Sequence, residues 1–181
     1  MYASNEWVIR EFIELARFTK RRDYYGNASL RYWYWNPEQA KKLFGDSSYV
    51  NNSSLFIVYT WQAFKICICS DLETKALENM ISEKEPYEEA LETDILVAAH
   101  HGHSQGYSSK WPEIIGKPYV SLISVQNRDP STASGYSSSD FARGVPFGGE
   151  KRYALTTRRD GTIVVTMWYE NRKPTWVFKK E

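Results

Sequence analysis

Apolar and polar positions alternate along this chain with two periods, and each period predicts one type of element. Near the N-terminus, apolar residues recur every three or four positions over residues 7–18, which predicts an amphipathic helix with Asn5 as its N-cap. Shorter amphipathic segments predict helices over residues 38–43, 72–81 and 108–115. Short apolar runs bounded by turn-forming residues predict strands over residues 30–35, 54–60, 64–69, 95–99, 119–125, 153–156, 163–168 and 175–178.

Turn chemistry predicts how these elements are connected. Residues 61–63 form a tight connection, which predicts a hairpin between the second and third strands. The acidic segment 82–93 is interrupted by a proline, so we predict no regular element there. Residues 126–139 are rich in Ser, Asn, Asp, Gly and Pro and predict a long surface loop, followed by one helical turn at 140–143. The pair Asp160-Gly161 predicts a turn between two of the last strands.

The order of these elements indicates an α/β (α+β) layered sandwich, in which a mixed sheet is flanked by helices. A length of 181 residues suits a single domain spanning residues 1–181. Within it, we expect residues 1–28 to form an N-terminal helix and linker, and residues 29–181 to form the layered body of the domain.

Composition excludes several classes of protein. The 23 basic and 22 acidic residues leave a net charge of +1, which argues against a strongly electrostatic nucleic-acid binder. The apolar runs are shorter than a membrane span, and the N-terminus lacks the pattern of a signal peptide. Cys67 and Cys69, the only cysteines, share one face of a predicted strand. We interpret them as buried small hydrophobes in a protein of the reducing cytoplasm.

Candidate chemistry gathers after two of the predicted strands. The three histidines of the chain all follow one apolar strand, at positions His100, His101 and His103. Asp71 has the equivalent place after an earlier strand. Ligands bind at the carboxyl ends of strands in open α/β sheets, and a carboxylate with imidazoles there suits zinc or manganese. Two simpler interpretations stay open, in which Asp71 caps the following helix and the histidines belong to a turn.

Five motifs in order along the chain resemble those of a known family. They are Asn51-Asn-Ser-Ser-Leu-Phe-Ile-Val-Tyr59, Phe64-Lys-Ile-Cys-Ile-Cys-Ser-Asp71-Leu72, Asp94-Ile-Leu-Val-Ala-Ala-His-His-Gly102, Pro118-Tyr-Val-Ser-Leu-Ile-Ser-Val125 and Asp160-Gly-Thr-Ile163. Together they resemble the metallo-β-lactamase superfamily, and most of all the metallo-hydrolase domain at the C-terminus of ComEC-type DNA-uptake proteins. In that group an Asn-rich turn opens a strand hairpin that ends in Gly-Asp, and a later apolar strand leads into His-His-Gly.

This resemblance implies a fold, a metal site and a reaction. The family packs two sheets between helices as αββα layers, and residues 29–181 would supply its C-terminal half. The family's carboxylate that bridges two metal ions corresponds to Asp71, and its metal-binding histidine before Gly corresponds to His101. His100 and His103 would act in catalysis, as hydrogen-bond donors beside the metals or as proton carriers. The implied reaction is hydrolysis of a phosphodiester or nucleic acid with zinc or manganese.

The chain departs from the family in its set of metal ligands. The His-x-His-x-Asp-His motif of the family's first half is absent, and Ser70 replaces the Gly before the bridging Asp. Residues 127–131 read Asn-Arg-Asp-Pro-Ser where relatives often place His-Pro. Because zinc sites need at least three protein ligands, we expect the isolated chain to be inactive. A protein partner carrying the missing half is expected to complete the site across an uncovered apolar sheet face.

Two other interpretations stay open at the level of sequence. One is a degenerate, non-catalytic member of the family that acts as a binding or interaction module. The other is an unrelated α/β domain with a chance likeness. Basic residues near the long loop are candidate phosphate contacts in a hydrolase and ordinary surface charge otherwise, namely Arg128, Arg143, Lys151 and Arg152.

Overall fold

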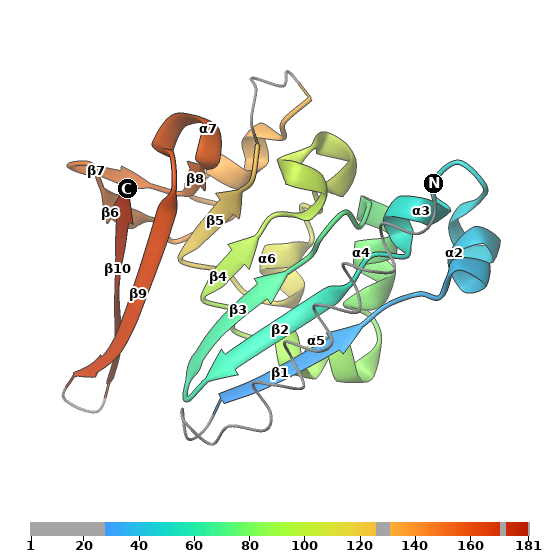
Figure 1. The fold of residues 1–181 in the computed structure, drawn as a ribbon, viewed down its shortest axis with the longest axis horizontal. Coiled ribbons are helices and arrows are strands. Elements are labelled where there is room, and N and C mark those ends of the chain that lie inside the picture. Colours follow the sequence, from blue (N-terminus) through green and yellow to red (C-terminus); the bar gives the residue numbers. More distant parts are fainter. Residues whose placement is uncertain (1–27, 126–130, 171–172, 181) are drawn as a thin grey trace.

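A computed structural model gives the fold, and it describes residues 28–125, 131–170 and 173–180. Its central element is a sheet of six strands in the order β1-β2-β3-β4-β5-β8 (Figure 1). These strands are β1 (Ala28–Trp33), β2 (Phe56–Trp61), β3 (Phe64–Ile68), β4 (Ile95–Val97), β5 (Val120–Ile123) and β8 (Ala154–Thr156). The predicted α/β class, with a mixed sheet and flanking helices, is confirmed.

The pairing between neighbouring strands of this sheet changes from antiparallel to parallel at β3. β2 runs antiparallel to both β1 and β3, whereas β3, β4, β5 and β8 run parallel to one another. The hairpin predicted between β2 and β3 is confirmed, and Gln62 in its turn has a φ of 55°. Because the four parallel strands point the same way, the segments that follow them all leave the sheet at one edge.

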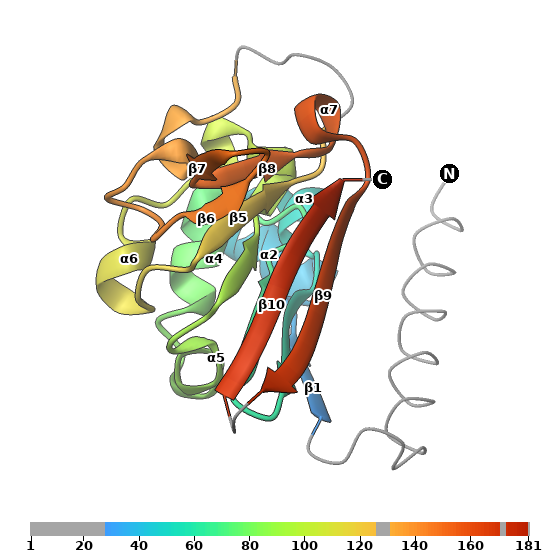
Figure 2. The same ribbon diagram turned by 90° about the vertical axis from the view of Figure 1, so that its left-hand side faces the viewer.

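Helices cover one face of the sheet, and a two-stranded hairpin covers part of the other (Figure 1, Figure 2). The helical layer contains α4 (Thr74–Met80), α5 (Lys84–Ala90) and α6 (Trp111–Ile114). Leu77 and Trp111 of these helices share a buried core with Cys67 and Leu96 of the sheet. The hairpin consists of β9 (Ile163–Glu170) and β10 (Lys173–Lys180). A second core on that face includes Phe178 of the hairpin and Phe64, Ile95 and Val120 of the sheet.

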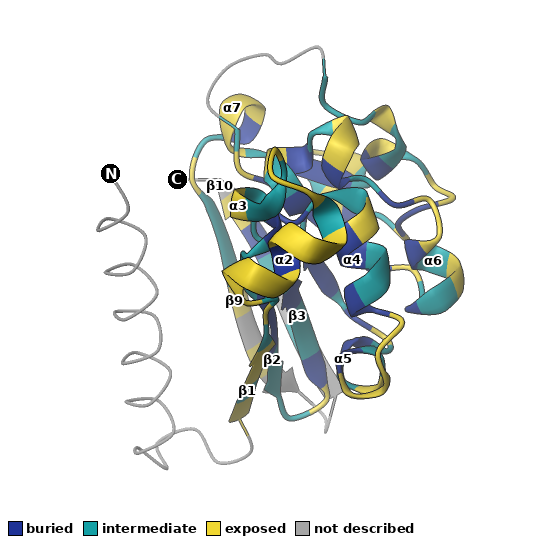
Figure 3. Ribbon diagram, turned by 90° about the vertical axis from the view of Figure 1, so that its right-hand side faces the viewer, coloured by how far each residue is buried: buried dark blue, intermediate teal, exposed yellow. Residues whose placement is uncertain are grey.

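The connection between β1 and β2 carries the helices α2 (Pro37–Phe44) and α3 (Tyr49–Asn52). Asn36 caps α2, because its Oδ1 accepts from Gln39 N at 2.9 Å while Gln39 Oε1 accepts from Asn36 N at 3.3 Å. Pro37 occupies the first helical position, where the missing N–H has no partner to lose. Figure 3 shows the outer side of α2 exposed, and Ala40 is its buried residue. The helix predicted over residues 38–43 is therefore confirmed.

Two expectations about helices are wrong. The helix after β3 begins at Thr74 with Glu73 in the N-cap position, so Asp71 does not cap it. The acidic segment expected to be irregular contains α5. Its proline, Pro86, lies in the first helical turn, where backbone N–H groups have no intrahelical acceptor, so the proline removes no helical bond.

The turn predicted at Asp160-Gly161, between two of the last strands, is present, and Gly161 has a φ of 70°. However, β8 pairs with β5 and β9 pairs with β10, so the residues on either side of the turn do not form a hairpin together. A short helix, α7 (Thr157–Asp160), follows β8 instead. The prediction also missed a small hairpin made by β6 (Val145–Phe147) and β7 (Glu150–Arg152).

Short 3₁₀ helices complete the described structure, at Ala99–Gly102, Ser104–Gly106 and Ser134–Ser137. The helix predicted over residues 7–18 and the linker that follows it lie outside the described residues. Within the described ranges, none of the helices combines the length and the apolar character that crossing a bilayer requires.

Candidate functional site

Asp71 and His101 meet at the edge of the sheet where the parallel strands end. β3 and β4 are parallel neighbours, and Ile68 and Val97 are their last paired residues. Asp71 follows Ile68 by three positions, and His101 follows Val97 by four. Oδ1 of Asp71 and Nε2 of His101 lie 3.4 Å apart. The structure therefore pairs the two residues that the sequence analysis assigned to metal binding.

The backbone around this pair has an uncommon conformation. Ser70, His100 and His101 have φ angles of 47°, 48° and 54°, in the left-handed region that residues with side chains seldom adopt. The N–H of His100 donates to Ser70 O at 2.7 Å and connects the two strand ends. Each such residue costs about 1–3 kcal/mol, and such residues cluster at functional sites. The strain at these adjacent strand ends therefore supports a functional site here.

Gly102 completes the histidine turn for two separate reasons. Its φ is 77°, a conformation in which glycine avoids the strain of a side chain. A Cβ at this position would also lie 2.7 Å from Cγ2 of Ile123 on β5. The His-His-Gly sequence thus combines a left-handed turn with a close approach to the neighbouring strand.

A backbone carbonyl fixes the tautomer of His101. Its Nδ1 lies 2.9 Å from the carbonyl oxygen of Ser124, the residue directly after β5. Because a carbonyl oxygen only accepts hydrogen bonds, Nδ1 carries the hydrogen, and the neutral ring has its lone pair on Nε2. This lone pair faces Oδ1 of Asp71. Two acceptors therefore face each other unless a proton or a cation lies between them. No motif along the chain indicated this role for Ser124.

His100 and His103 form a second pair beside the first. Their ring centroids are 5.1 Å apart, with an angle of 31° between the ring planes. Nδ1 of His103 accepts a hydrogen bond from Gln105 N at 3.1 Å, so neutral His103 has its hydrogen on Nε2. Nδ1 of His100 is buried and has no hydrogen-bond partner among the described residues. His103 thus presents a donor at Nε2, whereas His101 presents a lone pair.

The Asp71–His101 pair is accessible from solvent. The side chain of Asp71 is 47% exposed and that of His101 is 63% exposed. A polar pair as exposed as this contributes little to folding stability, about 0–1 kcal/mol. Folding therefore gains little from the pair, while a ligand or another chain has access to both side chains.

Two asparagines before β2 hold the segment that carries Asp71. Asn52 is buried, its Oδ1 accepts from Glu73 N at 2.8 Å, and its Nδ2 donates to Glu73 Oε2 at 3.3 Å. Asn51 Nδ2 donates to Glu73 Oε1 at 3.4 Å. These bonds fix Glu73 two positions after Asp71. Neither asparagine was predicted to have a chemical role, and their only signal in the sequence was the Asn-Asn pair in the first motif.

The long loop returns to the sheet beside the histidine turn. Ser104 N donates to Ser131 O at 2.7 Å, and Ala133 N donates to Gly102 O at 2.9 Å. Thr132 forms a β-bridge with His103 between these two bonds. The end of the predicted long loop therefore contacts the candidate site, while residues 126–130 lie outside the described residues.

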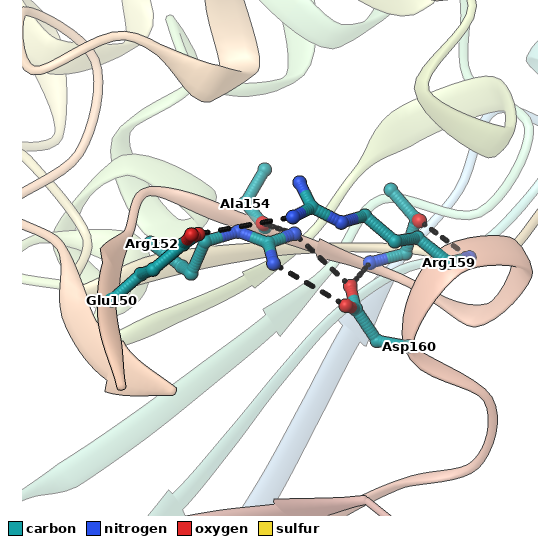
Figure 4. A network of polar contacts seen from close by, with 6 residues as sticks. Glu150, Arg152, Ala154, Arg159 and Asp160 are labelled. Carbon is teal, nitrogen blue, oxygen red and sulfur yellow. Dashed lines mark hydrogen bonds and ion pairs between the residues drawn. The ribbon is translucent and has the colours of Figure 1, made fainter. Parts of the chain in front are cut away.

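The basic residues considered as phosphate contacts have partners of their own. Arg152 binds the buried Asp160 through two contacts, at 3.4 and 3.3 Å (Figure 4). The cationic groups of Arg143 and Lys151 lie 4.8 and 5.6 Å from the centroids of tyrosine rings. Arg128 lies outside the described residues. Arg152 is therefore a structural residue, because binding a phosphate would require it to leave a buried carboxylate.

The two cysteines belong to the core. Cys67 and Cys69 are both free and buried, which confirms their interpretation as small hydrophobes. Burial, together with the neighbouring Cys69, raises the pKa of the Cys67 thiol well above its usual value. Metals bind the thiolate, which this environment disfavours.

Asp71 and His101 stand as a pair in the described part of the chain. Among the described residues, no group of three or more His, Cys, Asp or Glu side chains is placed to hold a metal ion. No family model matches the chain, and neither a curated protein nor a solved structure matches it. We therefore infer the function from the geometry of the site and from the sequence motifs.

Proposed function

We propose that Asp71 and His101 bind a divalent metal ion, zinc or manganese, and that the chain is the C-terminal half of a metallo-β-lactamase-like hydrolase. One observation carries this proposal. Nε2 of His101 faces Oδ1 of Asp71 at 3.4 Å, while Nδ1 is already bound to Ser124 O. A cation between these two acceptors makes an otherwise unfavourable contact attractive.

The separation of the two donor atoms fits a shared zinc ion. Zinc bonds to histidine nitrogen and carboxylate oxygen are about 2.0–2.2 Å long, in tetrahedral geometry. Two bonds of about 2.1 Å at the tetrahedral angle place their donor atoms about 3.4 Å apart. The distance from Nε2 to Oδ1 is 3.4 Å. A charged hydrogen bond between the same atoms would be shorter, about 2.7–2.9 Å.

A partner with further ligands is part of the proposal, because two ligands are too few for a zinc site. The sheet face at β1–β4 supports an interface there. Tyr32 of β1 is 42% exposed. By the strand register, three half-buried apolar residues lie on the same face of the sheet as Tyr32, namely Leu30, Ile68 and Val97. Apolar surface of this kind is typical of interfaces. We propose that the partner packs a sheet here and brings the His-x-His-x-Asp-His ligands, in a cytoplasm where free thiols stay reduced.

Each residue of the site has a distinct role in this proposal. The Asp71 carboxylate has two oxygens and is able to bind two cations, and His101 contributes Nε2. A bound metal would supply a water of lowered pKa and stabilise charge on a phosphate oxygen. His103 would donate the hydrogen on Nε2 to substrate, with its ring held against His100. A phosphodiester or nucleic acid is the proposed substrate, by analogy with ComEC-type domains.

A non-catalytic binding module is the second candidate function. The observation that favours it is the absence, among the described residues, of a third ligand grouped with Asp71 and His101. In this case the chain would bind metal weakly in every context and would hydrolyse nothing when its partner is present.

Manganese-induced line broadening in NMR spectra tests metal binding by the purified chain. Mn²⁺ is paramagnetic and broadens the resonances of nearby amides even when it binds weakly. We expect broadening at residues 70–72 and 100–102, reversed by added zinc. Asp71→Asn and His101→Gln should abolish it, whereas Asp46→Asn, which changes a carboxylate that is 76% exposed, should not. Broadening that survives the first two substitutions would contradict the proposal.

A hydrolysis assay separates the two candidate functions. Mixed with a protein that carries the His-x-His-x-Asp-His half, the chain should hold two metal ions per complex and hydrolyse bis-p-nitrophenyl phosphate. Asp71→Ala should remove one of the two metal ions and the activity. A complex that binds metal without hydrolysis would favour the binding module. Tight stoichiometric metal in the chain alone would show that no partner is needed.

A further inference from the structure

The pairing of β5 with β8 ends just before the residue that orients His101. The last paired residues are Ile123 and Thr156, and α7 then turns the chain away from β5. The hydroxyl of Thr157 continues the connection. Its Oγ1 accepts from Val125 N at 2.9 Å and donates to Val125 O at 2.9 Å. One side chain therefore satisfies both backbone groups of Val125.

The hydrogen bond from Val125 N to Thr157 Oγ1 also fixes the direction of the Ser124 carbonyl, which accepts from His101. Ser124 C=O and Val125 N–H belong to the same planar peptide group, and in a trans peptide they point in opposite directions. No peptide bond in the described structure is cis. When Thr157 holds Val125 N–H, it therefore also sets the direction of Ser124 O, which lies 2.9 Å from Nδ1 of His101.

Thr157 belongs to a turn that is held by several polar contacts. Oδ2 of the buried Asp160 accepts from Thr156 N at 2.8 Å, and the same carboxylate pairs with Arg152 (Figure 4). Oγ1 of Thr156 accepts from Arg159 N at 3.1 Å and caps α7. The side chain of Thr157 lies on the exposed side of this turn, so its substitution leaves the buried ion pair in place.

We propose that Thr157 is a positioning residue that sets the tautomer of His101. By holding the peptide between Ser124 and Val125, its hydroxyl directs a carbonyl at Nδ1 and so turns the lone pair of Nε2 toward Asp71. The consequence for metal affinity rests on the proposed function. The consequence for the tautomer is a property of the metal-free chain and does not rest on it.

Nitrogen-15 NMR of the metal-free protein tests the inference, because the two ring nitrogens of histidine have different shifts in each tautomer. At alkaline pH we expect wild-type His101 to be the Nδ1–H tautomer. Thr157→Val and Thr157→Ala remove the hydroxyl and should give a mixture of both tautomers, whereas Thr157→Ser should restore the wild-type spectrum. Thr162→Val, at an exposed threonine beyond α7, is the matched control and should change nothing.

An unchanged His101 tautomer in folded Thr157→Val and Thr157→Ala would overturn the positioning role, whether or not the protein binds metal. A manganese titration provides the second readout. Residues that orient a metal ligand affect affinity about 10–100-fold, and we expect the lower end, about tenfold, for Thr157→Val. If the Thr157 variants change the tautomer of His101 but the wild-type chain binds no Mn²⁺, the proposed function is overturned and the positioning role stands.

Discussion

The substitution Gly102→Ala should destabilise the histidine turn, and the structure gives the two contributions to the lost free energy of unfolding. Gly102 has a φ of 77°, and an added Cβ would lie 2.7 Å from Cγ2 and 3.2 Å from Cδ1 of Ile123. The left-handed conformation costs an alanine about 1–2 kcal/mol. Forcing an extra methyl into a packed core costs about 1–3 kcal/mol more. We therefore expect Gly102→Ala to lower the free energy of unfolding by about 2–5 kcal/mol.

Gly116→Ala is the matched control for this prediction. Gly116 has a φ of 97°, but no atom lies within 4 Å of its added Cβ, so it should lose only the conformational term of about 1–2 kcal/mol. Urea denaturation followed by tryptophan fluorescence measures both losses. Equal losses would refute the close contact between the histidine turn and β5. In an Ile123→Ala background, Gly102→Ala should cost less, because the truncation removes the clashing atom.

Three further variants test other contacts. Burial acts to raise the pKa of Glu78, but hydrogen bonds from Lys110 and a serine outweigh it and lower the pKa from 4.5. Its stabilising contribution is thus present above pH 4.5 and lost as the pH falls through the folded value, so Glu78→Gln should flatten the acid-denaturation profile there. Asn52→Ala should cost about 1–3 kcal/mol in urea denaturation, because Glu73 N loses its acceptor. Asp160→Asn should cost about 3–5 kcal/mol in the same assay, because it breaks a buried ion pair, and a loss below about 1 kcal/mol would contradict that assignment.

Sequence spacing predicted the strands that form the middle of the sheet. β3, β4 and β5 each lie within a predicted strand, and β2 extends one residue beyond the strand predicted over residues 54–60. Each of these strands is a continuous apolar run between turn-forming residues. Their ends were less accurate. The strand expected over residues 95–99 ends at Val97, since Ala99 already belongs to the 3₁₀ turn that carries the histidines. Local apolar pattern thus predicts that a strand exists, while contacts from neighbouring segments decide where it ends.

The two wrong helix predictions have a common physical cause. Pro86 was interpreted as a helix breaker and Asp71 as a helix cap, yet each meaning depends on where the helix begins. The start of α4 moves to Thr74 because Asn52, 21 positions away, binds both the N–H and the carboxylate of Glu73. No pattern within a short window contains that contact. Asp160 was predicted only as part of a turn, and the contacts of its carboxylate with Arg152 and Thr156 N likewise lie outside what a short sequence pattern contains.

Sequence patterns predicted which residues form the candidate site, but they did not predict the tautomer of His101. Two polar residues after neighbouring parallel strands are expected to meet, and Asp71 and His101 do so. The tautomer of His101 depends on Ser124 and Thr157, which are 23 and 56 positions away in sequence. These contacts cross from β4 to β5 and from β5 to β8. They exist only because the parallel order of the sheet places the three strand ends side by side.

The N-cap position of Glu73 bears on whether Asp71 is a structural residue or a ligand. A capping carboxylate has its oxygens bound by backbone N–H groups and has no need of an imidazole. Here Glu73 occupies the cap position, and Asp71 faces a ring whose other nitrogen is bound to Ser124. The contact is attractive only if Nε2 gains a proton or both groups share a cation. The 3.4 Å between Nε2 and Oδ1 therefore supports the proposed role of Asp71 as a ligand, because a shared cation would give both acceptor atoms an attractive partner.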